Sequence, residues 1–316
     1  MNMRQLGKDG PWLTEIGLGT WAIGGPWRWG WGAQDDRESI RAIQHGLEKG
    51  INWIDTAAAY GLGHAEEILA KALKGKRHEV FIATKCGLVW DAQGNVQNNI
   101  HPDSIMKEAE ASLRRLQTDY IDLYQIHWPD SRTPVEDSWG ALIKLREQGK
   151  IKYMGVSNFN VDLLERCQRV SHINSLQPPY SLLNRHIEKE ILPWCREQQV
   201  GVVAYSPLQS GLLTGTFDKS KLAKDDWRHQ SNYFKEPWLS KNLLFVERLK
   251  SLAGSYGKSV IHLAIAWVLM NPAVTSAIVG VRKVSQVDEM IGAADWRLKE
   301  EDMAEIEKIR ERTFSD

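Results

Sequence analysis

The sequence predicts an α/β protein, a closed (β/α)8 TIM barrel with an N-terminal β-hairpin as a plug and extra helices at its C-terminus. Strand-like and helix-like segments alternate along the chain, which is typical of a parallel sheet covered by helices. We count eight strands after the opening hairpin, and 316 residues suffice for one such barrel. Because no linker, low-complexity segment or internal repeat interrupts the alternation, we expect a single domain over residues 1–316.

The predicted elements follow in chain order. Residues 3–19 read as two short strands around a Gly-Lys-Asp-Gly-Pro turn. Apolar, β-branched runs predict strands at 51–55, 79–85, 120–127, 151–158, 173–177, 201–208 and 275–281. Amphipathic runs predict helices at 35–50, 64–75, 101–117, 134–150, 161–170, 186–200, 243–257 and 259–271, and two further helical segments close the chain. Pro193 is expected to bend its helix, and a long polar loop is expected to run through Tyr233.

Three tryptophans, Trp27, Trp29 and Trp31, lie among glycines in the segment GPWRWGWG, residues 25–32. Glycine-rich text with interleaved aromatic residues predicts a loop, which we call the tryptophan loop. Two interpretations are open. The loop is either held in place by its own aromatic rings, or its rings form the wall of a ligand cleft, since such clefts are mostly apolar and aromatic.

Composition and charge argue against several classes of partner. Lysine plus arginine equal aspartate plus glutamate at 40 each, so net charge gives no reason to expect nucleic acid or an anionic membrane. The three cysteines fit a reducing compartment, and no cysteine–histidine spacing predicts a metal site. The N-terminus lacks an apolar signal core and no run of about 18 apolar residues exists, so we expect a cytoplasmic protein without a membrane span.

Ionisable side chains stand at the ends of three predicted strands. Asp55, Lys85 and His127 each follow a strand-like run, and Tyr60 follows Asp55 in a loop of small residues. Each has an ordinary structural interpretation: a helix N-cap, a solvated lysine, a core histidine and a packing tyrosine. Taken together, these structural interpretations do not explain why three predicted strands all end in an ionisable residue. Charges at the edge of a core are costly unless they are paired. Since the carboxyl ends of barrel strands meet at one mouth, we expect the four side chains to converge there.

The four side chains suit proton transfer coupled to hydride transfer. A phenol with a pKa of about 10 is a weak acid at neutral pH, and the Lys85 ammonium is expected to lower the pKa of Tyr60. Asp55 would hold Lys85 in place, and a neutral His127 would donate a hydrogen bond to a carbonyl oxygen. No G-x-G-x-x-G motif opens a helix after a strand, so a Rossmann-type dinucleotide site is not expected.

Along almost its whole length the chain resembles the aldo-keto reductases, most of all the bacterial sugar and polyol branch. The resemblance rests on GTW at 19–21, DTAAAYG at 55–61, ATK at 83–85, QIHWPD at 125–130, GVSNF at 155–159, YSPL at 205–208 and AIVGVRKVSQVDEM at 277–290. It implies a barrel that binds a nicotinamide cofactor and reduces aldehydes, ketones or sugars. It also implies that Asp55, Tyr60, Lys85 and His127 form the catalytic tetrad, with Tyr60 as the general acid.

The resemblance further implies the residues that bind cofactor and substrate. For the cofactor they are Thr20, Trp21, Asp55, Ser157, Asn158, Gln177, Tyr205, Ser206, Pro207, Leu208, Ser210, Gly211, Leu213, Gly280, Val281, Arg282, Gln286 and Glu289. For the carbonyl substrate they are Trp21, Trp27, Tyr60, Trp90, His127 and Trp128. Arg282 is expected to bind the 2′-phosphate, which favours NADPH/NADP+ over NADH. Many relatives have an arginine where this chain has Gln286 and an asparagine where it has Met290.

Two other functions are open at this point. Potassium-channel β subunits resemble the same family, can keep the tetrad and act chiefly through protein contacts, so a nicotinamide-binding regulatory subunit is the alternative to an enzyme. A barrel lyase or isomerase without a cofactor is a third interpretation. For the enzyme, we expect the tryptophan loop to shape substrate selection rather than cofactor affinity. The sequence predicts neither the substrate nor the oligomeric state.

Overall fold

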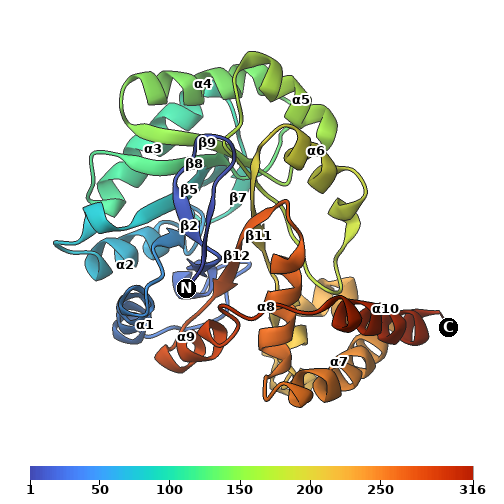
Figure 1. Ribbon diagram of the computed structural model, residues 1–316. Coiled ribbons are helices and arrows are strands. Elements are labelled where there is room, and N and C mark those ends of the chain that lie inside the picture. Colours follow the sequence, from blue (N-terminus) through green and yellow to red (C-terminus); the bar gives the residue numbers. More distant parts are fainter. Residues whose placement is uncertain (316) are drawn as a thin grey trace.

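Eight parallel strands close a barrel in the computed structural model, which describes residues 1–315 (Figure 1). Their order around the barrel is β10-β11-β12-β3-β4-β5-β8-β9, so barrel strands that follow one another in the chain are neighbours. The strands are β3 (Ile16–Gly19), β4 (Trp53–Asp55), β5 (Phe81–Cys86), β8 (Ile121–Ile126), β9 (Ile151–Ser157), β10 (Ser175–Gln177), β11 (Gly201–Tyr205) and β12 (Val274–Gly280). The predicted (β/α)8 fold is confirmed.

The first barrel strand was misplaced by the sequence analysis. Only seven barrel strands follow the region assigned to the hairpin, and the eighth, Ile16–Gly19, is the end of that region. The hairpin itself pairs β1 (Met3–Gln5) with β2 (Trp12–Thr14). A Cβ at Gly17 would lie 2.1 Å from the Trp53 ring, so this strand needs a residue without a side chain. The resulting run Ile-Gly-Leu-Gly is poor in strand-forming residues and gives little strand signal.

The hairpin plugs the N-terminal end of the barrel, as predicted. Leu6 and Leu13 are fully buried among inward-facing side chains of the barrel strands, namely Trp53, Ala83, Leu123, Val203 and Ile278. The backbone N–H of Lys8 also donates to the carbonyl of Gln199, just before β11, at 3.0 Å. The barrel interior at the amino ends of the strands is therefore a packed core. A functional site is expected at the opposite end, where the strands have their carboxyl ends.

Helices surround the barrel (Figure 1). They are α1 (Asp36–Glu48), α2 (His64–Ala72), α3 (Pro102–Leu116), α4 (Val135–Glu147), α5 (Val161–Val170), α6 (Ile191–Glu197), α7 (Trp238–Ser255), α8 (Val260–Met270), α9 (Val284–Ile291) and α10 (Glu300–Phe314). The C-terminal α10 packs against α7, so the predicted extra C-terminal helices are present. Within residues 1–315 no single helix is long and apolar enough to cross a membrane; α7 and α8 reach that length only together, across an 89° bend.

One local prediction needs correction, and two features were not predicted. The helix expected at 186–200 is a 3₁₀ turn followed by α6, and Pro193 lies in the first turn of α6, where it breaks no intrahelical hydrogen bond and bends nothing. A second hairpin, β6 (Leu88–Trp90) with β7 (Val96–Asn98), was missed. The long loop after β11 contains four short 3₁₀ segments, η4 (Gln209–Thr214), η5 (Lys219–Lys221), η6 (Trp227–Gln230) and η7 (Asn232–Phe234).

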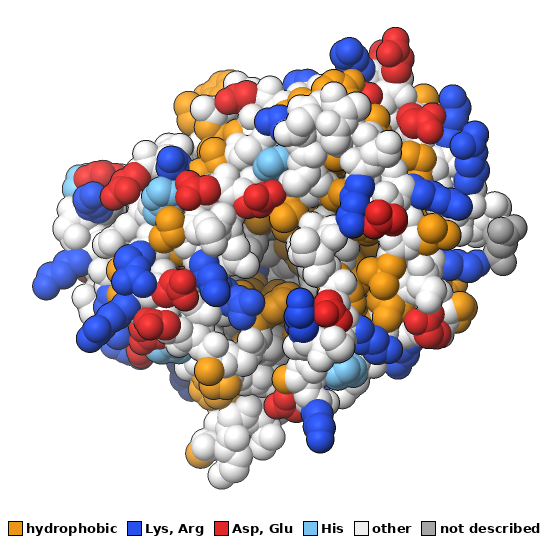
Figure 2. Space-filling model, turned by 90° about the horizontal axis from the view of Figure 1, so that it is seen from below, with side chains coloured by type: hydrophobic (Ala, Val, Ile, Leu, Met, Phe, Trp, Pro, Cys, Tyr) orange, Lys and Arg blue, Asp and Glu red, His pale blue; other side chains and the backbone are white. Residues whose placement is uncertain are grey.

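The cysteines lie inside the protein. All three cysteines are buried, and none forms a disulfide. No group of His, Cys, Asp or Glu within the described part of the chain could hold a metal ion. One face of the molecule is hollowed near its centre, with hydrophobic side chains inside the hollow and lysine and arginine side chains beside it (Figure 2).

A partly buried carboxylate holds the end of β5. Glu108 of α3 accepts hydrogen bonds from the backbone N–H of Gly87, at 2.9 Å, and from the Ser104 hydroxyl, at 3.0 Å. Gly87 directly follows β5 and has a φ of 92°. Burial raises the pKa of Glu108 to about 7, although these hydrogen bonds and Arg115 oppose the rise, and the nearby Glu66 adds to it. Glu108 therefore anchors the turn from β5 into the second hairpin.

The raised pKa of Glu108 predicts a specific pH dependence of stability. Between pH 4.5 and about 7 the unfolded chain has lost this proton and the folded chain keeps it, so the free energy of unfolding falls as pH rises. Glu108→Gln keeps an acceptor for the Gly87 N–H and removes the titrating group. Relative to wild type, its free energy of unfolding should therefore be higher at about pH 8 than at about pH 5, by up to roughly 3 kcal/mol. Urea unfolding at both pH values measures this, and an equal effect at the two would contradict it.

The hairpin plug predicts that alanine substitutions at two neighbouring positions differ in their effect on the free energy of unfolding. Leu13→Ala should lower the free energy of unfolding by about 2–5 kcal/mol, because it leaves a cavity in a closed core. Trp12→Ala is the matched control; its side chain is 59% exposed, so a change of about 0.5 kcal/mol or less is expected. Denaturant unfolding of both variants tests the plug, and equal losses would mean that the hairpin merely covers the barrel.

Candidate active site

A buried ion pair forms the floor of the site at the carboxyl ends of β4 and β5. Asp55 is 2% exposed and Lys85 is 1% exposed. The Lys85 Nζ donates to both carboxylate oxygens of Asp55, each at 2.8 Å, and to the carbonyl of Thr56 at 2.8 Å. Its fourth neighbour is the hydroxyl of Tyr60, at 3.4 Å. The convergence of three predicted residues on one point is thus observed.

Two glycines position Tyr60. Gly24, in the 3₁₀ segment η1 (Trp21–Gly24), contacts the backbone that follows Tyr60. A Cβ at Gly61, whose φ is 62°, would lie 1.9 Å from the carbonyl oxygen of Gly24. The backbone of Tyr60 can pack so closely against η1 only because both positions lack a side chain. This contact directs the phenol back toward the strand ends.

His127 completes the group from the end of β8. Its ring lies edge-on to Tyr60, with 5.9 Å between the ring centroids. Its backbone N–H donates to the carbonyl of Cys86 at 2.9 Å, and its carbonyl accepts from the side-chain amide of Asn158 at 3.0 Å. Burial lowers the pKa of His127 well below 6.5, and the Lys85 ammonium lowers it further. The imidazole is therefore neutral at physiological pH and keeps one N–H for donation.

The electrostatics of Tyr60 differ from the expectation. Burial raises the pKa of the Tyr60 hydroxyl well above 10, and the charge of Asp55 raises it further. Burial also raises the pKa of Asp55 and lowers that of Lys85, while the charge of each partner opposes the shift of the other. Contrary to the expectation, the pKa of the phenol is not lowered overall, because burial and the Asp55 carboxylate outweigh the nearby ammonium. Tyr60 therefore keeps its proton.

Four of the residues predicted to bind the cofactor form one hydrogen-bonded network beside the pair. The Gln177 side-chain amide donates to Asp55 at 2.8 Å. The Ser157 hydroxyl donates to the carbonyl of Gln177 at 2.7 Å, and the Tyr205 hydroxyl donates to the side-chain carbonyl of Asn158 at 2.8 Å. These residues end β9, β10 and β11, so the network connects that half of the barrel mouth to Asp55. Thr20 also belongs here, since its hydroxyl donates to the carbonyl of Asp55 at 3.1 Å.

The segment after β11 leaves the strand through left-handed backbone. Ser206, Ser210 and Gly211 have φ values of 56°, 53° and 97°. Such turns expose hydroxyl groups and backbone donors, which suits an anionic ligand. Pro207 is buried and Leu208 packs on the core. The Leu213 side chain is fully buried, so only its backbone can meet a ligand.

The segment after β12 agrees only in part with the predicted cofactor contacts. Gly280 is exposed, whereas the Val281 side chain is 1% exposed and belongs to the core. The side-chain carbonyl of Gln286 accepts from the backbone N–H of Arg282 at 2.8 Å, which shapes the start of α9. Glu289 is turned toward α8 and accepts from the hydroxyl of Ser259 at 2.7 Å. A ligand would have to displace that bond to reach the Glu289 carboxylate.

Arg228 and Trp227 were missed by the sequence analysis. The Arg228 guanidinium carbon lies 4.5 Å from the centroid of the Trp31 ring, and that of Arg282 lies 6.0 Å from the same centroid. Trp227 stacks on Trp21, with 5.3 Å between centroids. The signal in the sequence was an aromatic residue next to an arginine, within the polar loop after β11. The spacing to Trp31, almost 200 residues, hid the contact.

The aromatic residues predicted for the substrate do not act as one group. Trp27 faces Tyr60 with 6.3 Å between ring centroids, and Trp128 is 44% exposed beside His127. Trp90 is placed differently, with the guanidinium of Arg115 5.8 Å from its ring. The proposed substrate roles of Trp27, Trp90 and Trp128 therefore stay predictions.

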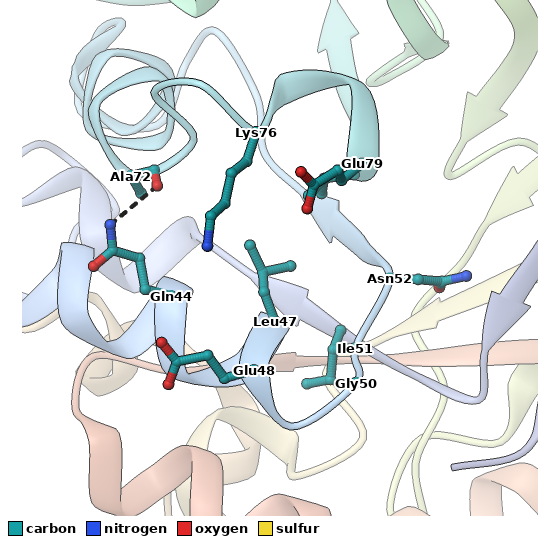
Figure 3. Close-up of a pocket in the computed structure, with 10 residues that line it drawn as sticks. Gln44, Leu47, Glu48, Gly50, Ile51, Asn52, Ala72, Lys76 and Glu79 are labelled. Atoms are coloured by element: carbon teal, nitrogen blue, oxygen red, sulfur yellow. Dashed lines mark hydrogen bonds between the residues drawn. The ribbon is translucent and has the colours of Figure 1, made fainter.

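The tryptophans of the tryptophan loop lie on two different sides of the site. Trp27 borders Tyr60, whereas Trp31 lies on Trp21, 5.6 Å away, and on the two arginines. The expectation that the loop acts on the substrate rather than on the cofactor stays a prediction. A separate hollow of about 310 Å³ lies at the other end of the barrel, between α1, α2 and the start of β4 (Figure 3). It is lined by Gln44, Lys76 and Glu79, among others, and has none of the four central residues.

Comparison with known proteins agrees with this geometry. The family model for the aldo/keto reductase family matches residues 15–311. Aldo-keto reductase YhdN of Bacillus subtilis (strain 168) is 40% identical over 320 residues, covering 100% of this chain and 96% of that protein. The NADH-specific methylglyoxal reductase of Escherichia coli (strain K12) is 35% identical over 312 residues, covering 95% of each. The structure of glycerol dehydrogenase AKR11B4 from Gluconobacter oxydans gives a TM-score of 0.91 at 40% identity, covering 99% of this chain and 96% of that one. The chain belongs to the aldo/keto reductase family.

Proposed function

We propose that the protein reduces small aldehydes or ketones to alcohols, with a nicotinamide cofactor as hydride donor and Tyr60 as proton donor. The observation that carries the proposal is the contact of the Tyr60 hydroxyl with the buried Asp55–Lys85 pair, 3.4 Å from the Lys85 Nζ. A tyrosine with only a packing role would not need this contact. A general acid benefits from it, because the ammonium stabilises the phenolate that remains when the proton has left. Family membership supports the reaction class.

The residues beside the pair fit a nicotinamide cofactor, which when bound supplies the hydride. The amide groups of Asn158 and Gln177 are suited to a carboxamide, and the Tyr205 ring offers a flat face at the end of its strand. Asn158 and Gln177 are held in place by Tyr205 and Asp55, respectively. These two side chains are therefore oriented before any ligand arrives, which lowers the entropy cost of binding.

The four central side chains divide the proton chemistry among them. Tyr60 holds its proton until a carbonyl oxygen gains negative charge and becomes the stronger base. As the proton leaves, negative charge develops on the phenol oxygen beside the Lys85 ammonium, which stabilises it. Asp55 keeps Lys85 charged and oriented. The neutral His127 can donate to the same carbonyl oxygen and help to polarise it.

The proposed cofactor preference rests on Arg282. We propose NADPH over NADH because Arg282 lies close to a second arginine, Arg228, and both guanidinium groups are near the Trp31 ring. One relative is named for NADH specificity, so NADH is the alternative cofactor. Met290, where many relatives have an asparagine, is 1% exposed and belongs to the core.

For the substrate we propose short, polar carbonyl compounds, or the matching polyols in the reverse direction. Relatives named for methylglyoxal and for glycerol support that class. Trp27 and Trp128 provide apolar faces around a small polar centre. The alternative of a regulatory subunit makes a different prediction, namely nicotinamide binding without turnover of any carbonyl compound.

Tyr60→Phe tests the role of the phenol. The change keeps the ring and removes the proposed proton donor, so kcat for a short aldehyde should fall by about 10²–10⁴-fold. Cofactor affinity should stay within about two-fold, since the ring remains. Steady-state kinetics and a cofactor titration check both parts. A variant that reduces an unactivated ketone at the wild-type rate would remove Tyr60 from the mechanism.

Arg282→Ala tests the proposed choice of cofactor. A charge-assisted hydrogen bond to phosphate contributes about 1.5–3 kcal/mol, so NADPH affinity should fall roughly ten- to a hundred-fold. NADH lacks the 2′-phosphate and should lose much less. Calorimetric titration with each cofactor gives the two ratios. If both cofactors lost affinity equally, Arg282 would not read the 2′-phosphate.

A further inference from the structure

Trp31 lies where three distant segments of the chain meet. Its ring stands edge-on to Trp21, at 5.6 Å, and to Trp227, at 6.2 Å. The guanidinium carbon of Arg228 lies 4.5 Å from its centroid and that of Arg282 lies 6.0 Å away. These residues come from the loop after β3, from the long loop after β11 and from the segment after β12. A single indole thus joins the loops on the phosphate-facing side of the proposed cofactor site.

The polar groups of this cluster are donors with few acceptors. The indole N–H groups of Trp31 and Trp227 are buried and have no hydrogen-bond partner. Arg228 is paired with Asp226 at 2.6 Å, but Arg282 has no ion-pair partner within residues 1–315. Buried donors without partners are costly and uncommon in folded proteins. Two guanidinium groups with two unused N–H donors fit a multiply charged anion such as a phosphate.

The two cations also repel one another. Burial lowers the pKa of Arg282, and the charge of Arg228 lowers it further, while Glu38 acts in the opposite direction. Attraction of each cation to the face of the Trp31 ring offsets part of that repulsion. Asp226 also holds Arg228, at 2.6 Å, so the Trp31 ring is the group of the cluster that both cations share.

We propose that Trp31 is a positioning residue that holds Arg228 and Arg282 ready for a phosphate group of the nicotinamide cofactor. The proposal rests on the proposed function, since it assumes that a nicotinamide cofactor is the ligand. It assigns Trp31 to cofactor affinity and leaves Trp27, on the same loop, to the substrate side. The phosphate is either the pyrophosphate, which both cofactors carry, or the 2′-phosphate, which only NADPH carries.

Isothermal titration of wild-type protein and three variants with NADPH, NADH and adenosine 2′,5′-bisphosphate tests the proposal. Trp31→Ala should weaken NADPH and the bisphosphate by about ten-fold or more. Trp29→Ala is the matched control from the same loop, since Trp29 contacts Trp27 and Arg28, and it should stay within about two-fold. Trp31→Phe keeps an aromatic face without the N–H and should lie between wild type and Trp31→Ala. Turnover at saturating cofactor should keep kcat within about two-fold in all three, which separates affinity from chemistry.

The results distinguish binding of the pyrophosphate from binding of the 2′-phosphate. They also distinguish failure of the Trp31 proposal from failure of the proposed function. A loss for NADPH alone assigns the 2′-phosphate, and a loss for both cofactors assigns the pyrophosphate; each supports the role of Trp31. Unchanged affinities in Trp31→Ala, or equal losses in the Trp29→Ala control, would overturn it. If Trp31→Ala does not fold by thermal melting, wild-type affinity in Trp31→Phe for every ligand would overturn it as well. A wild-type protein that binds no nicotinamide cofactor would instead contradict the proposed function.

Discussion

The buried pair of Asp55 and Lys85 is the interaction on which the rest of the site depends. Taking both charges out of water costs several kcal/mol per ion, and their mutual attraction repays this only with good geometry and further hydrogen bonds. The structure provides both, because Lys85 also donates to the carbonyl of Thr56 and Asp55 also accepts from Gln177. A buried pair of this kind contributes little net stability to the fold. We therefore relate the pair to the acid function of Tyr60 rather than to the stability of the barrel.

The barrel brings these groups together because strand ends from different parts of the chain meet at one mouth. Asp55 and Lys85 come from adjacent strands, and Gln177 comes from the opposite half of the barrel. The pair is therefore shared by the proton-donating side, through Tyr60, and by the proposed cofactor side, through Gln177. Such sharing connects the orientation of the acid with the place where a nicotinamide is proposed to bind.

Short-range patterns in the sequence predicted much of this arrangement. A short apolar run followed by an ionisable residue was sufficient to place Asp55, Lys85 and His127 at strand ends. The same approach failed at residues 16–19, because Gly17 is selected by the volume of the Trp53 ring, a contact that no local pattern reveals.

Other features depend on contacts between distant segments or on charge balance. Trp31 meets Arg228 and Arg282 across about 200 and 250 residues of chain, so no local pattern could assign it to them. The effect of Lys85 on Tyr60 was also mispredicted. Burial of the phenol and the charge of Asp55 raise the pKa of Tyr60 more than the ammonium lowers it, and neither effect could be weighed from the sequence.

The central claim is that the Asp55–Lys85 pair serves the acid function of Tyr60 rather than the stability of the barrel. The most direct measurement compares Lys85→Met with the double variant Asp55→Asn/Lys85→Met, by unfolding and by turnover. Lys85→Met alone leaves a buried, unpaired carboxylate and should cost about 3–5 kcal/mol of stability. The double variant removes both charges and should recover most of that loss, while its turnover stays at least about 10²-fold below wild type. A double variant that turns over at the wild-type rate would show that the pair is structural and would contradict this account.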